Sequence, residues 1–183
     1  VDVLPGGDSF YGLDFGYSND PTALVKNVIV GDSLFSQELI YETELTNDAI
    51  AYRMQELGVQ KHYDEIFADS AEPKSIEEIY RHGFNIKGAP KGPGSVEYGH
   101  QKIRQYKQLW TKDSVNCIKE QRNFRYIPDK NGKLTEKTTH AFSHGLDGRR
   151  YAIIGKLEPR DREDIVIYDA MSQVAELELE RNL

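Results

Sequence analysis

Apolar and polar positions alternate in the segment GLDFGYSNDPTALV, residues 12–25. Over its first six residues, an apolar side chain occupies every second position, and Asp14 lies between two of them. A period of two is typical of a β-strand with one buried face. The pattern therefore predicts a strand whose Asp14 lies on the face opposite its apolar residues. These apolar residues are Leu13, Phe15 and Tyr17.

Residues 21–42 predict two more strands, because they are rich in Val and Ile and lack the spacing of a helix. A turn at Gly31-Asp32 separates the two, so three consecutive antiparallel strands are the simplest arrangement. Apolar residues then recur at helical spacing over residues 46–60, and Gly58 marks the end of the predicted helix.

The rest of the chain alternates between short strands and helices. Residues 64–70 predict a strand that runs directly into Asp69, and residues 72–84 predict a helix. The later elements are a brief strand at 85–90, a helix at about 95–109, a helix and then a strand entering a hairpin at Asn131-Gly132, and a helix at 140–157 with weak points at Gly145 and Gly148. This order predicts a mixed α/β sheet flanked by helices, which is the outline of a ribonuclease H-like fold.

Composition supports one globular domain with an appendage. Of 183 residues, 38% are hydrophobic and 29% are charged, which is typical of a folded chain that buries a core. No apolar run approaches the length of a membrane span, and the first residues lack the pattern of a signal peptide. The single Cys117 permits no internal disulfide and fits a reducing compartment, so we expect a cytoplasmic protein. The chain begins with Val rather than Met, which suggests a fragment of a longer polypeptide.

Charge is distributed unevenly along the chain, although the net charge is −7. Residues 1–70 carry 3 basic and 13 acidic side chains, residues 71–156 carry 17 and 9, and residues 157–183 carry 3 and 8. Such asymmetry commonly reflects solvated faces, but it also fits an acidic metal site beside a basic track for a polyanion. The last segment is acidic and has an apolar helical stripe, so we divide the chain into a domain at 1–156 and a helical tail at 157–183.

Three aspartates lie where such a metal site would form. Asp14 lies on the first strand, Asp69 ends a later strand and Asp147 lies on a late helix. Ligands collect at strand ends in open α/β sheets, and carboxylates brought together there repel one another unless a cation separates them. Hard oxygen ligands suit Mg²⁺ or Mn²⁺, and two such ions can support phosphodiester hydrolysis. The alternative is that these residues only cap helices or close turns.

The sequence around these acids resembles that of a known family. The segments GLDFGYSNDPTALV, IFADSAEPKSIEEI, FRYIPDKNGKL and HAFSHGLDGRRYA are similar in order and spacing to the nuclease domain of phage terminase large subunits. The resemblance spans residues 12 to about 155. It implies a ribonuclease H-like fold in which three acids bind divalent metals and cut double-stranded concatemeric DNA. By motif, these acids correspond to Asp14, Asp69 and Asp147.

The sequence departs from the family pattern at three places. Ser143 occupies a position where an acid or amide is common, Gly148 replaces a usual Ala, and Tyr126 replaces a frequent Trp. The departures leave the acids intact, so they bear on rate and metal preference more than on reaction type. His144 precedes Asp147 by one helical turn and shares its face, which makes it a candidate to contact a phosphate or water, or simply a packing residue.

Basic residues of the middle segment are candidate DNA contacts. Lys74 follows Asp69 closely and is a candidate for the scissile phosphate, although it also suits an ordinary first helical turn. The remaining candidates lie in a glycine-rich loop, around the predicted hairpin and beside Asp147; each also has an ordinary explanation as a surface or packing residue. They are Lys87, Lys91, Lys130, Lys133 and Arg149.

The leading hypothesis from the sequence is a metal-dependent endonuclease domain in which Asp14 bridges two ions and Asp69 and Asp147 each complete one. The resemblance also implies an ATPase domain that is missing from this chain, since no phosphate-binding motif is present, and partners such as a portal protein and a small terminase subunit. One alternative is a catalytically silent DNA- or portal-binding module. Another is a different ribonuclease H-like nuclease, such as a resolvase or transposase.

Overall fold

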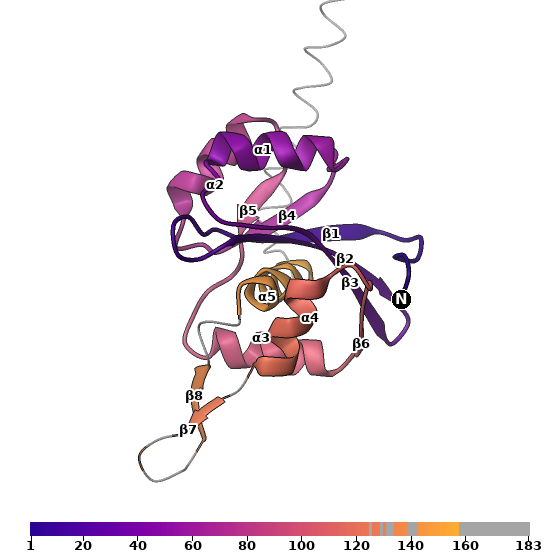
Figure 1. The fold of residues 1–183 in the computed structure, drawn as a ribbon, viewed down its shortest axis with the longest axis vertical. Helices are drawn as coiled ribbons and strands as arrows, with labels where there is room; N and C mark the ends of the chain where they lie inside the picture. Colours follow the sequence, from indigo (N-terminus) through magenta and orange to yellow (C-terminus); the bar gives the residue numbers. More distant parts are fainter. Residues whose placement is uncertain (125, 129, 131–133, 139–142, 158–183) are drawn as a thin grey trace, which may run out of the picture.

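A mixed sheet forms the centre of the computed structural model, which describes residues 1–124, 126–128, 130, 134–138 and 143–157. Its six described strands are ordered β5-β4-β1-β2-β3-β6 (Figure 1). The first three strands are antiparallel, as predicted, whereas β4 and β5 run parallel to β1 and β6 runs parallel to β3. The strands are β1 (Ser9–Asp14), β2 (Thr22–Val30), β3 (Ser33–Glu42), β4 (Glu65–Ala68), β5 (Ile86–Gly88) and β6 (Lys107–Trp110).

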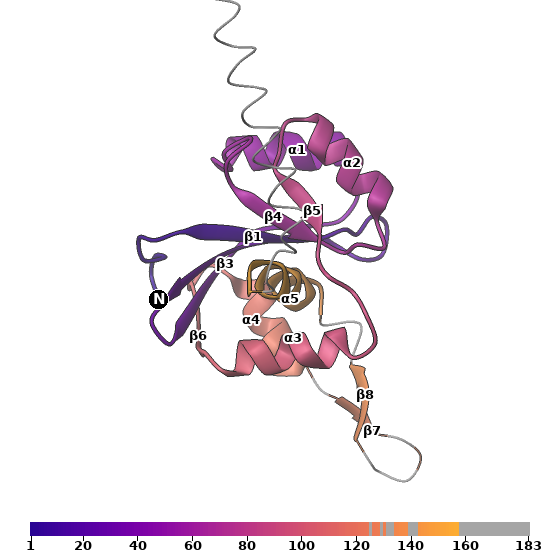
Figure 2. The same ribbon diagram turned by 180° about the vertical axis from the view of Figure 1, so that it is seen from behind.

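Helices cover both faces of this sheet. Helices α1 and α2 lie on one face, and α5 lies against the other with α3 and α4 outside it (Figures 1 and 2). The described helices are α1 (Asn47–Glu56), α2 (Pro73–Arg81), α3 (Ser95–Arg104), α4 (Val115–Asn123) and α5 (His144–Leu157). The mixed α/β sheet flanked by helices that the sequence predicts is therefore confirmed. None of the helices in the described ranges is long and apolar enough to cross a bilayer.

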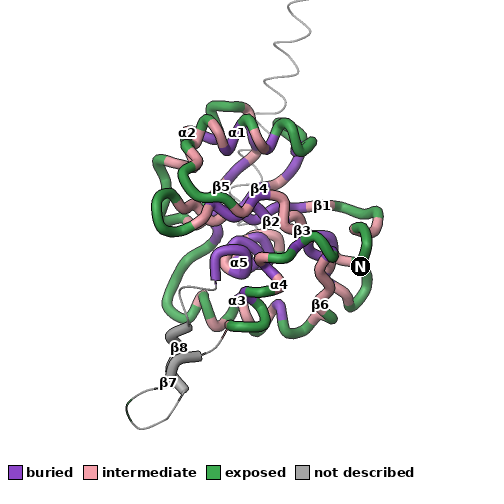
Figure 3. The backbone as a smooth tube through the Cα atoms, viewed as in Figure 1, coloured by how far each residue is buried: buried purple, intermediate pink, exposed green. Residues whose placement is uncertain are grey.

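Two apolar cores result from this layering. Alternate residues of β1 contribute to each: Tyr11 and Leu13 pack under α1 and α2, whereas Phe10 packs with residues of α5 such as Ile153. Because both faces of the sheet are covered, β1 is buried on both sides and α5 is among the most buried helices (Figure 3). Asp14 does lie on the face opposite Leu13, but that face is covered by a helix and not by water.

The first strand ends earlier than the alternation predicts. Phe15 and Tyr17 follow the strand. Phe15 is half-buried against the core under α1 and α2, but Tyr17 is 59% exposed, so the predicted buried stripe does not extend past Phe15. The chain turns away at this point because Thr22 on β2 bonds both to the backbone N–H and to the carbonyl of Gly16. Asp14 is therefore the last residue of β1 and lies at the C-terminal end of this inner strand.

A second correction concerns the helix predicted over about 95–109. Helix α3 ends at Arg104, and β6 follows at the edge of the sheet. Residues 105–110 contain no Gly or Pro, so the pattern shows no stop signal where the helix ends. Strand pairing determines where the helix ends instead. Residues 107–110 pair in parallel with the open edge of β3 at Ser33 to Ser36.

Close contact between β1 and α5 sets the position of the late helix. A Cβ added to Gly12 would lie well inside the van der Waals radius of the Gly148 carbonyl oxygen, so only glycine at residue 12 allows the helix to approach this closely. Gly145 and Gly148, predicted as weak points, lie within a continuous helix. Strands β7 (Tyr126–Pro128) and β8 (Leu134–Thr138) pair as an antiparallel hairpin, but its predicted turn at Asn131-Gly132, and the tail beyond Leu157, lie outside the described residues.

Candidate metal centre

Three separate elements bring the predicted carboxylates to one end of the sheet. Strands β1 and β4 are parallel neighbours in which Leu13 pairs with Ala68, so Asp14 and Asp69 occupy adjacent positions at the same ends of their strands. Asp147 lies in the first turn of α5, which packs on β1 through the close contact at Gly12. Residues far apart in the sequence thus converge at the place where α/β sheets commonly bind ligands.

Glu120 of α4 fixes the N-terminus of α5. One of its carboxylate oxygens accepts hydrogen bonds from the backbone N–H groups of Gly145 and Leu146, and the other accepts from His144 N and the Tyr41 hydroxyl. Three backbone donors that a helix leaves unsatisfied are therefore paired by a side chain from another helix. Glu120 was not predicted from the sequence, because nothing in its local pattern distinguishes it from an ordinary helical acid.

Asp14 is the most buried of the three carboxylates. Its side chain is 15% exposed, and His144 Nδ1 lies 3.2 Å from its Oδ2. Burial raises the pKa of Asp14 to about 6; Asp147 and Asp69 add to the rise, and the contact with His144 offsets only part of it. His144 lies one helical turn before Asp147, and this spacing brings its ring to the carboxylate of Asp14.

His144 connects Asp14 to the surface. Its Nε2 lies 3.5 Å from Oδ1 of Asp20, which is largely exposed in the loop between β1 and β2. The hydrogen bond to Asp14 raises the pKa of His144, with a further contribution from the charge of Asp20. His144 is thus a buried side chain with an acid on each side, Asp14 at 3.2 Å and Asp20 at 3.5 Å.

Asp69 is held by three donors. Its Oδ1 accepts from Lys91 Nζ at 3.0 Å and from the backbone N–H of Ala71 at 2.9 Å, and its Oδ2 accepts from the Tyr151 hydroxyl at 3.3 Å. Burial alone would raise the pKa of Asp69, but the hydrogen bonds from Ala71 and Lys91 outweigh it and lower the pKa. Of the predicted DNA-contacting lysines, Lys91 is the one that the structure places at the carboxylates.

Asp147 is paired with Arg150, one turn along the same helix. Arg150 donates from Nε at 3.0 Å and from Nη2 at 2.7 Å to the same oxygen, Oδ1, of Asp147. Its guanidinium lies 4.5 Å from the centre of the Tyr151 ring, and its side chain is only 8% exposed.

Each carboxylate therefore faces its own positive or donor group: His144 for Asp14, Lys91 for Asp69 and Arg150 for Asp147. No three acid, histidine or cysteine side chains in the described part of the chain already form a set around one ion position. The donor chemistry nevertheless fits Mg²⁺ or Mn²⁺, since all three groups are hard oxygen donors and their mutual repulsion contributes to the raised pKa of Asp14. A divalent ion would relieve this repulsion once the present partners move aside.

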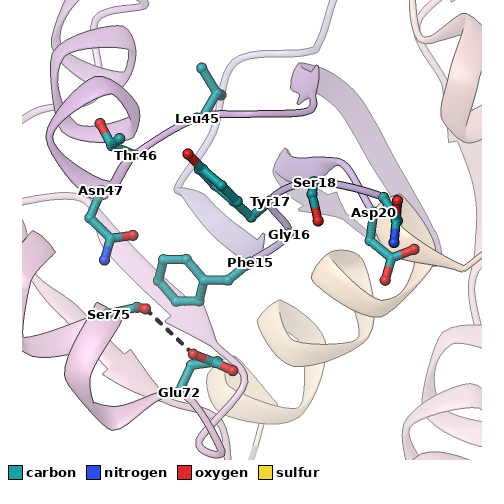
Figure 4. Close-up of a pocket in the computed structure, with 11 residues that line it drawn as sticks. Phe15, Gly16, Tyr17, Ser18, Asp20, Leu45, Thr46, Asn47, Glu72 and Ser75 are labelled. Atoms are coloured by element: carbon teal, nitrogen blue, oxygen red, sulfur yellow. Dashed lines mark hydrogen bonds between the residues drawn. The ribbon is translucent and has the colours of Figure 1, made fainter.

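A hollow borders the loop that follows Asp14. A cavity of about 460 Å³ lies between the loop after β1 and the first turns of α1 and α2. Phe15 and Tyr17 lie on one side of it, with Asn47 and Ser75 opposite (Figure 4). A second hollow is lined by His144, and a smaller one of about 120 Å³ is lined by Asp69 together with Lys91, Arg150 and Tyr151.

Other predicted contacts lie elsewhere. Lys74 is exposed in the first turn of α2, and Lys130 is exposed beside the hairpin. Lys87 pairs with Glu65 at 3.2 Å and lies over the ring of Phe67. Lys133 lies outside the described residues.

The predicted DNA contact of Arg149 is contradicted by the structure. Arg149 is 3% exposed and lies among β6, α4 and α5, with its guanidinium 4.6 Å from the centre of the Trp110 ring. The sequence placed it beside Asp147, but neighbouring residues on a helix point in different directions. Arg149 therefore cannot reach DNA from this position, and Arg150 occupies the place at the acids.

Comparison with known proteins identifies the family. The model of the terminase RNase H-like domain matches residues 14–154. The chain is 32% identical over 145 residues to the PBSX phage terminase large subunit of Bacillus subtilis (strain 168), and 34% identical over 149 residues to the terminase large subunit of Bacillus phage SPP1. These alignments cover 78% and 77% of the chain, but it spans only about a third of each relative, 33% and 34%.

Solved structures agree with this match. The nuclease domain of the SPP1 large terminase, solved with bound Mn, is 31% identical and superimposes with a TM-score of 0.71, covering 79% of this chain and 84% of that domain. The large terminase nuclease of thermophilic phage G20c, solved with bound magnesium, is 18% identical with a TM-score of 0.57. The match covers 83% of each chain and shows the same fold. The ribonuclease H-like fold is thereby confirmed, and the chain belongs to the ribonuclease H-like nuclease-domain family of phage terminase large subunits.

Proposed function

We propose that this domain is a divalent-metal-dependent endodeoxyribonuclease that cuts double-stranded concatemeric DNA during phage DNA packaging. The observation that carries the proposal is the convergence of Asp14, Asp69 and Asp147. They come from two parallel strands and one helix and lie at the C-terminal ends of these strands. The relative from SPP1, whose nuclease domain was solved with bound Mn, supports the choice of metal. Hydrolysis of a phosphodiester is the reaction that such a set of carboxylates serves.

The chain's own residues would divide the work as follows. Asp14, the central and most buried acid, would be shared between two ions, while Asp69 and Asp147 would each hold one. Bound Mg²⁺ or Mn²⁺ supplies activation of a water and stabilisation of charge on the phosphate. His144 would keep the Asp14 carboxylate oriented through its contact at 3.2 Å.

Two basic side chains, Lys91 and Arg150, would remain in the site when the carboxylates bind metal ions. Lys91 and Arg150 now neutralise Asp69 and Asp147, and both side chains would become available to phosphate oxygens when the carboxylates turn to metal. Lys91 is more than half exposed and is the better placed of the two to follow a DNA backbone. Lys74, Lys87 and Lys130 would add phosphate contacts without reading sequence, so binding should weaken with salt.

The remaining parts of the packaging machine would lie outside this chain. Because the chain spans about a third of its curated relatives, we propose that the intact protein also contains an ATPase domain. A portal protein and a small terminase subunit are the further partners proposed for it, and the cytoplasm of the bacterial host is the proposed location.

Nicking of supercoiled plasmid with Mn²⁺ tests the proposal. Asp14→Asn, Asp69→Asn and Asp147→Asn are each expected to abolish nicking while the far-ultraviolet circular dichroism spectrum is unchanged. Asp48→Asn is the matched control, because this side chain is 88% exposed on α1 and forms its ion pair there with His82. Full activity in any one of the three variants would remove that residue from the site.

One observation favours a second candidate, a catalytically silent DNA- or portal-binding module. All three carboxylates already have partners, as residues with a purely structural role would. Calorimetry separates the two candidates, since a silent module would show no Mn²⁺ binding that depends on Asp14.

A further inference from the structure

A small cavity lies on the side of α5 that faces away from the three carboxylates. Its volume is about 150 Å³, and α3, β6, α4 and α5 enclose it. Arg149 lies two residues beyond Asp147, a rotation of about 200° around the helix, so the two side chains point to nearly opposite sides. The cavity is thus separate from the candidate metal centre.

Arg149 is incompletely satisfied in this place. Its Nη2 donates to the side-chain oxygens of Gln108 at 2.8 Å and of Gln121 at 3.3 Å. Its Nε and Nη1 are buried and have no hydrogen-bond partner among the described residues. A buried guanidinium with two unpaired nitrogens is costly, and such groups in folded proteins commonly mark a bound ion or ligand.

No carboxylate of the described residues forms an ion pair with this guanidinium. The charge of Glu120 raises the pKa of Arg149, but both Glu120 oxygens are already occupied by the backbone of α5 and by Tyr41. Burial lowers the pKa of Arg149 to about 10, which still leaves it protonated at neutral pH. The positive charge therefore remains with unused donors.

The other walls of the cavity indicate what kind of anion would fit. Arg104 adds a second guanidinium at the more exposed edge, where it pairs with Glu97 at 2.6 Å. His100 adds no charge, since burial and the charge of Arg150 lower its pKa to about 4. Ile103, Phe124 and Leu146 supply apolar surface. A strongly hydrated dianion would lose its water against such walls, whereas a carboxylate on a short apolar stem would match both parts of the cavity.

We propose that this cavity binds a carboxylate group, with Arg149 as its charged partner and Ile103, Phe124 and Leu146 around its apolar stem. The carboxylate can belong to a small free acid or to a glutamate side chain of a polypeptide, because a volume of about 150 Å³ admits little more than the end of such a chain. The site lies beyond the proposed nuclease function and does not depend on it.

Trp110 provides a direct reporter of occupancy. It is the single tryptophan of the chain, it lies against the Arg149 guanidinium, and its indole N–H donates to Gln121. We would titrate the full chain with sodium butyrate and with butanamide, its neutral isostere, at constant ionic strength held with NaCl. Butyrate is expected to change Trp110 fluorescence saturably and to bind at least about tenfold more tightly than butanamide, as a charge-assisted pair requires.

Two variants and one further measurement complete the test. Arg149→Gln should abolish the preference for butyrate, and Arg104→Gln should weaken butyrate several-fold because it removes only the outer charge. If Arg149→Gln fails to fold, the Nε–H resonance of Arg149 in the wild-type protein decides, since it should shift with butyrate and not with butanamide. N-acetyl-glutamate N-methylamide distinguishes the sources: tighter binding than butyrate indicates a polypeptide glutamate, and weaker binding indicates a free acid. Equal response to butyrate, butanamide and added NaCl would overturn the proposal.

Discussion

Replacing Asp14 with asparagine should stabilise the metal-free domain at pH 8, although it should destroy metal binding. The ionised Asp14 carboxylate is buried at the end of β1 and lies near two other acids, and these surroundings raise its pKa from 3.8 to about 6. An asparagine keeps the shape of the side chain, and its oxygen can still accept from His144. The substitution therefore removes a charge that the folded state disfavours without opening a cavity.

The size of the effect follows from the pKa difference. A rise of about two units corresponds to about 3 kcal/mol at about 1.4 kcal/mol per unit. The raised pKa means that the folded state binds the proton more tightly than the unfolded state, so stability falls as pH rises from about 4 to about 6 and stays low above. Asp14→Asn should consequently match the wild type below pH 4 and exceed it above pH 6 by up to about 3 kcal/mol, which is roughly 6–12 °C in Tm.

Asp69→Asn is the matched control with the opposite sign. Hydrogen bonds from Ala71 and Lys91 lower the pKa of Asp69, so its ionised form stabilises the fold above the pKa of the unfolded chain. That contribution is lost as pH falls through the folded pKa. Asp69→Asn should accordingly be less stable than the wild type at pH 8, although it removes the same charge from the same cluster.

Thermal denaturation from pH 4 to pH 8 measures both variants, first in a chelator and then in Mn²⁺. The metal should raise the Tm of the wild type, because it binds only the folded state, and should leave Asp14→Asn unchanged. At pH 8, the advantage in Tm of Asp14→Asn over the wild type in chelator should therefore shrink or reverse in Mn²⁺. The reasoning is refuted if Asp14→Asn in chelator is no more stable than the wild type at pH 8, or if both variants shift in the same direction.

Two further substitutions test how the late helix is positioned. Gly12→Ala should destabilise the domain by about 3 kcal/mol or more in urea denaturation, since its Cβ would overlap the Gly148 carbonyl. Gly148→Ala should change stability by about 1 kcal/mol or less, because its Cβ would lie 3.2 Å from the Gly12 carbonyl oxygen. Equal effects of the two substitutions would contradict the close contact between β1 and α5. Glu120→Gln should cost about 2–4 kcal/mol and weaken Mn²⁺ binding measured by calorimetry, because an amide can replace only part of the acceptors that hold α5; unchanged stability would show that Glu120 does not anchor the helix.

The fold was predictable where a local pattern and the tertiary structure agree. The segment at 21–42, rich in Val and Ile as a whole, predicted β2 and β3, and the apolar stripe capped at Thr46 predicted α1. The end of α3 was not predictable, because nothing in residues 105–110 ends a helix and the open edge of β3 determines that they form β6. The end of β1 was missed for a similar reason, since the alternation continues to Tyr17 while contacts of Thr22 turn the chain at Gly16.

The site was predictable in its acids and less so in their partners. A carboxylate at a strand end is visible in a sequence, because the strand pattern itself marks the end, and the family resemblance selected Asp147. Partners depend on which faces meet in three dimensions. Arg149 and Arg150 are adjacent in the sequence, yet one lies buried against Trp110 and the other binds Asp147. Glu120 caps a helix 24 residues away from it, and no spacing rule connects the two.

The arrangement of charges explains how such a site can fold before it binds metal. Asp14, Asp69 and Asp147 affect one another electrostatically, and a cluster of this kind without compensation would oppose folding. Lys91 and Arg150 each neutralise one outer acid, whereas the pKa of the central acid, Asp14, is raised to about 6. The cost of preorganisation is thereby concentrated on Asp14, the residue that is proposed to be shared between two ions, and a divalent metal would find its largest gain in binding energy there.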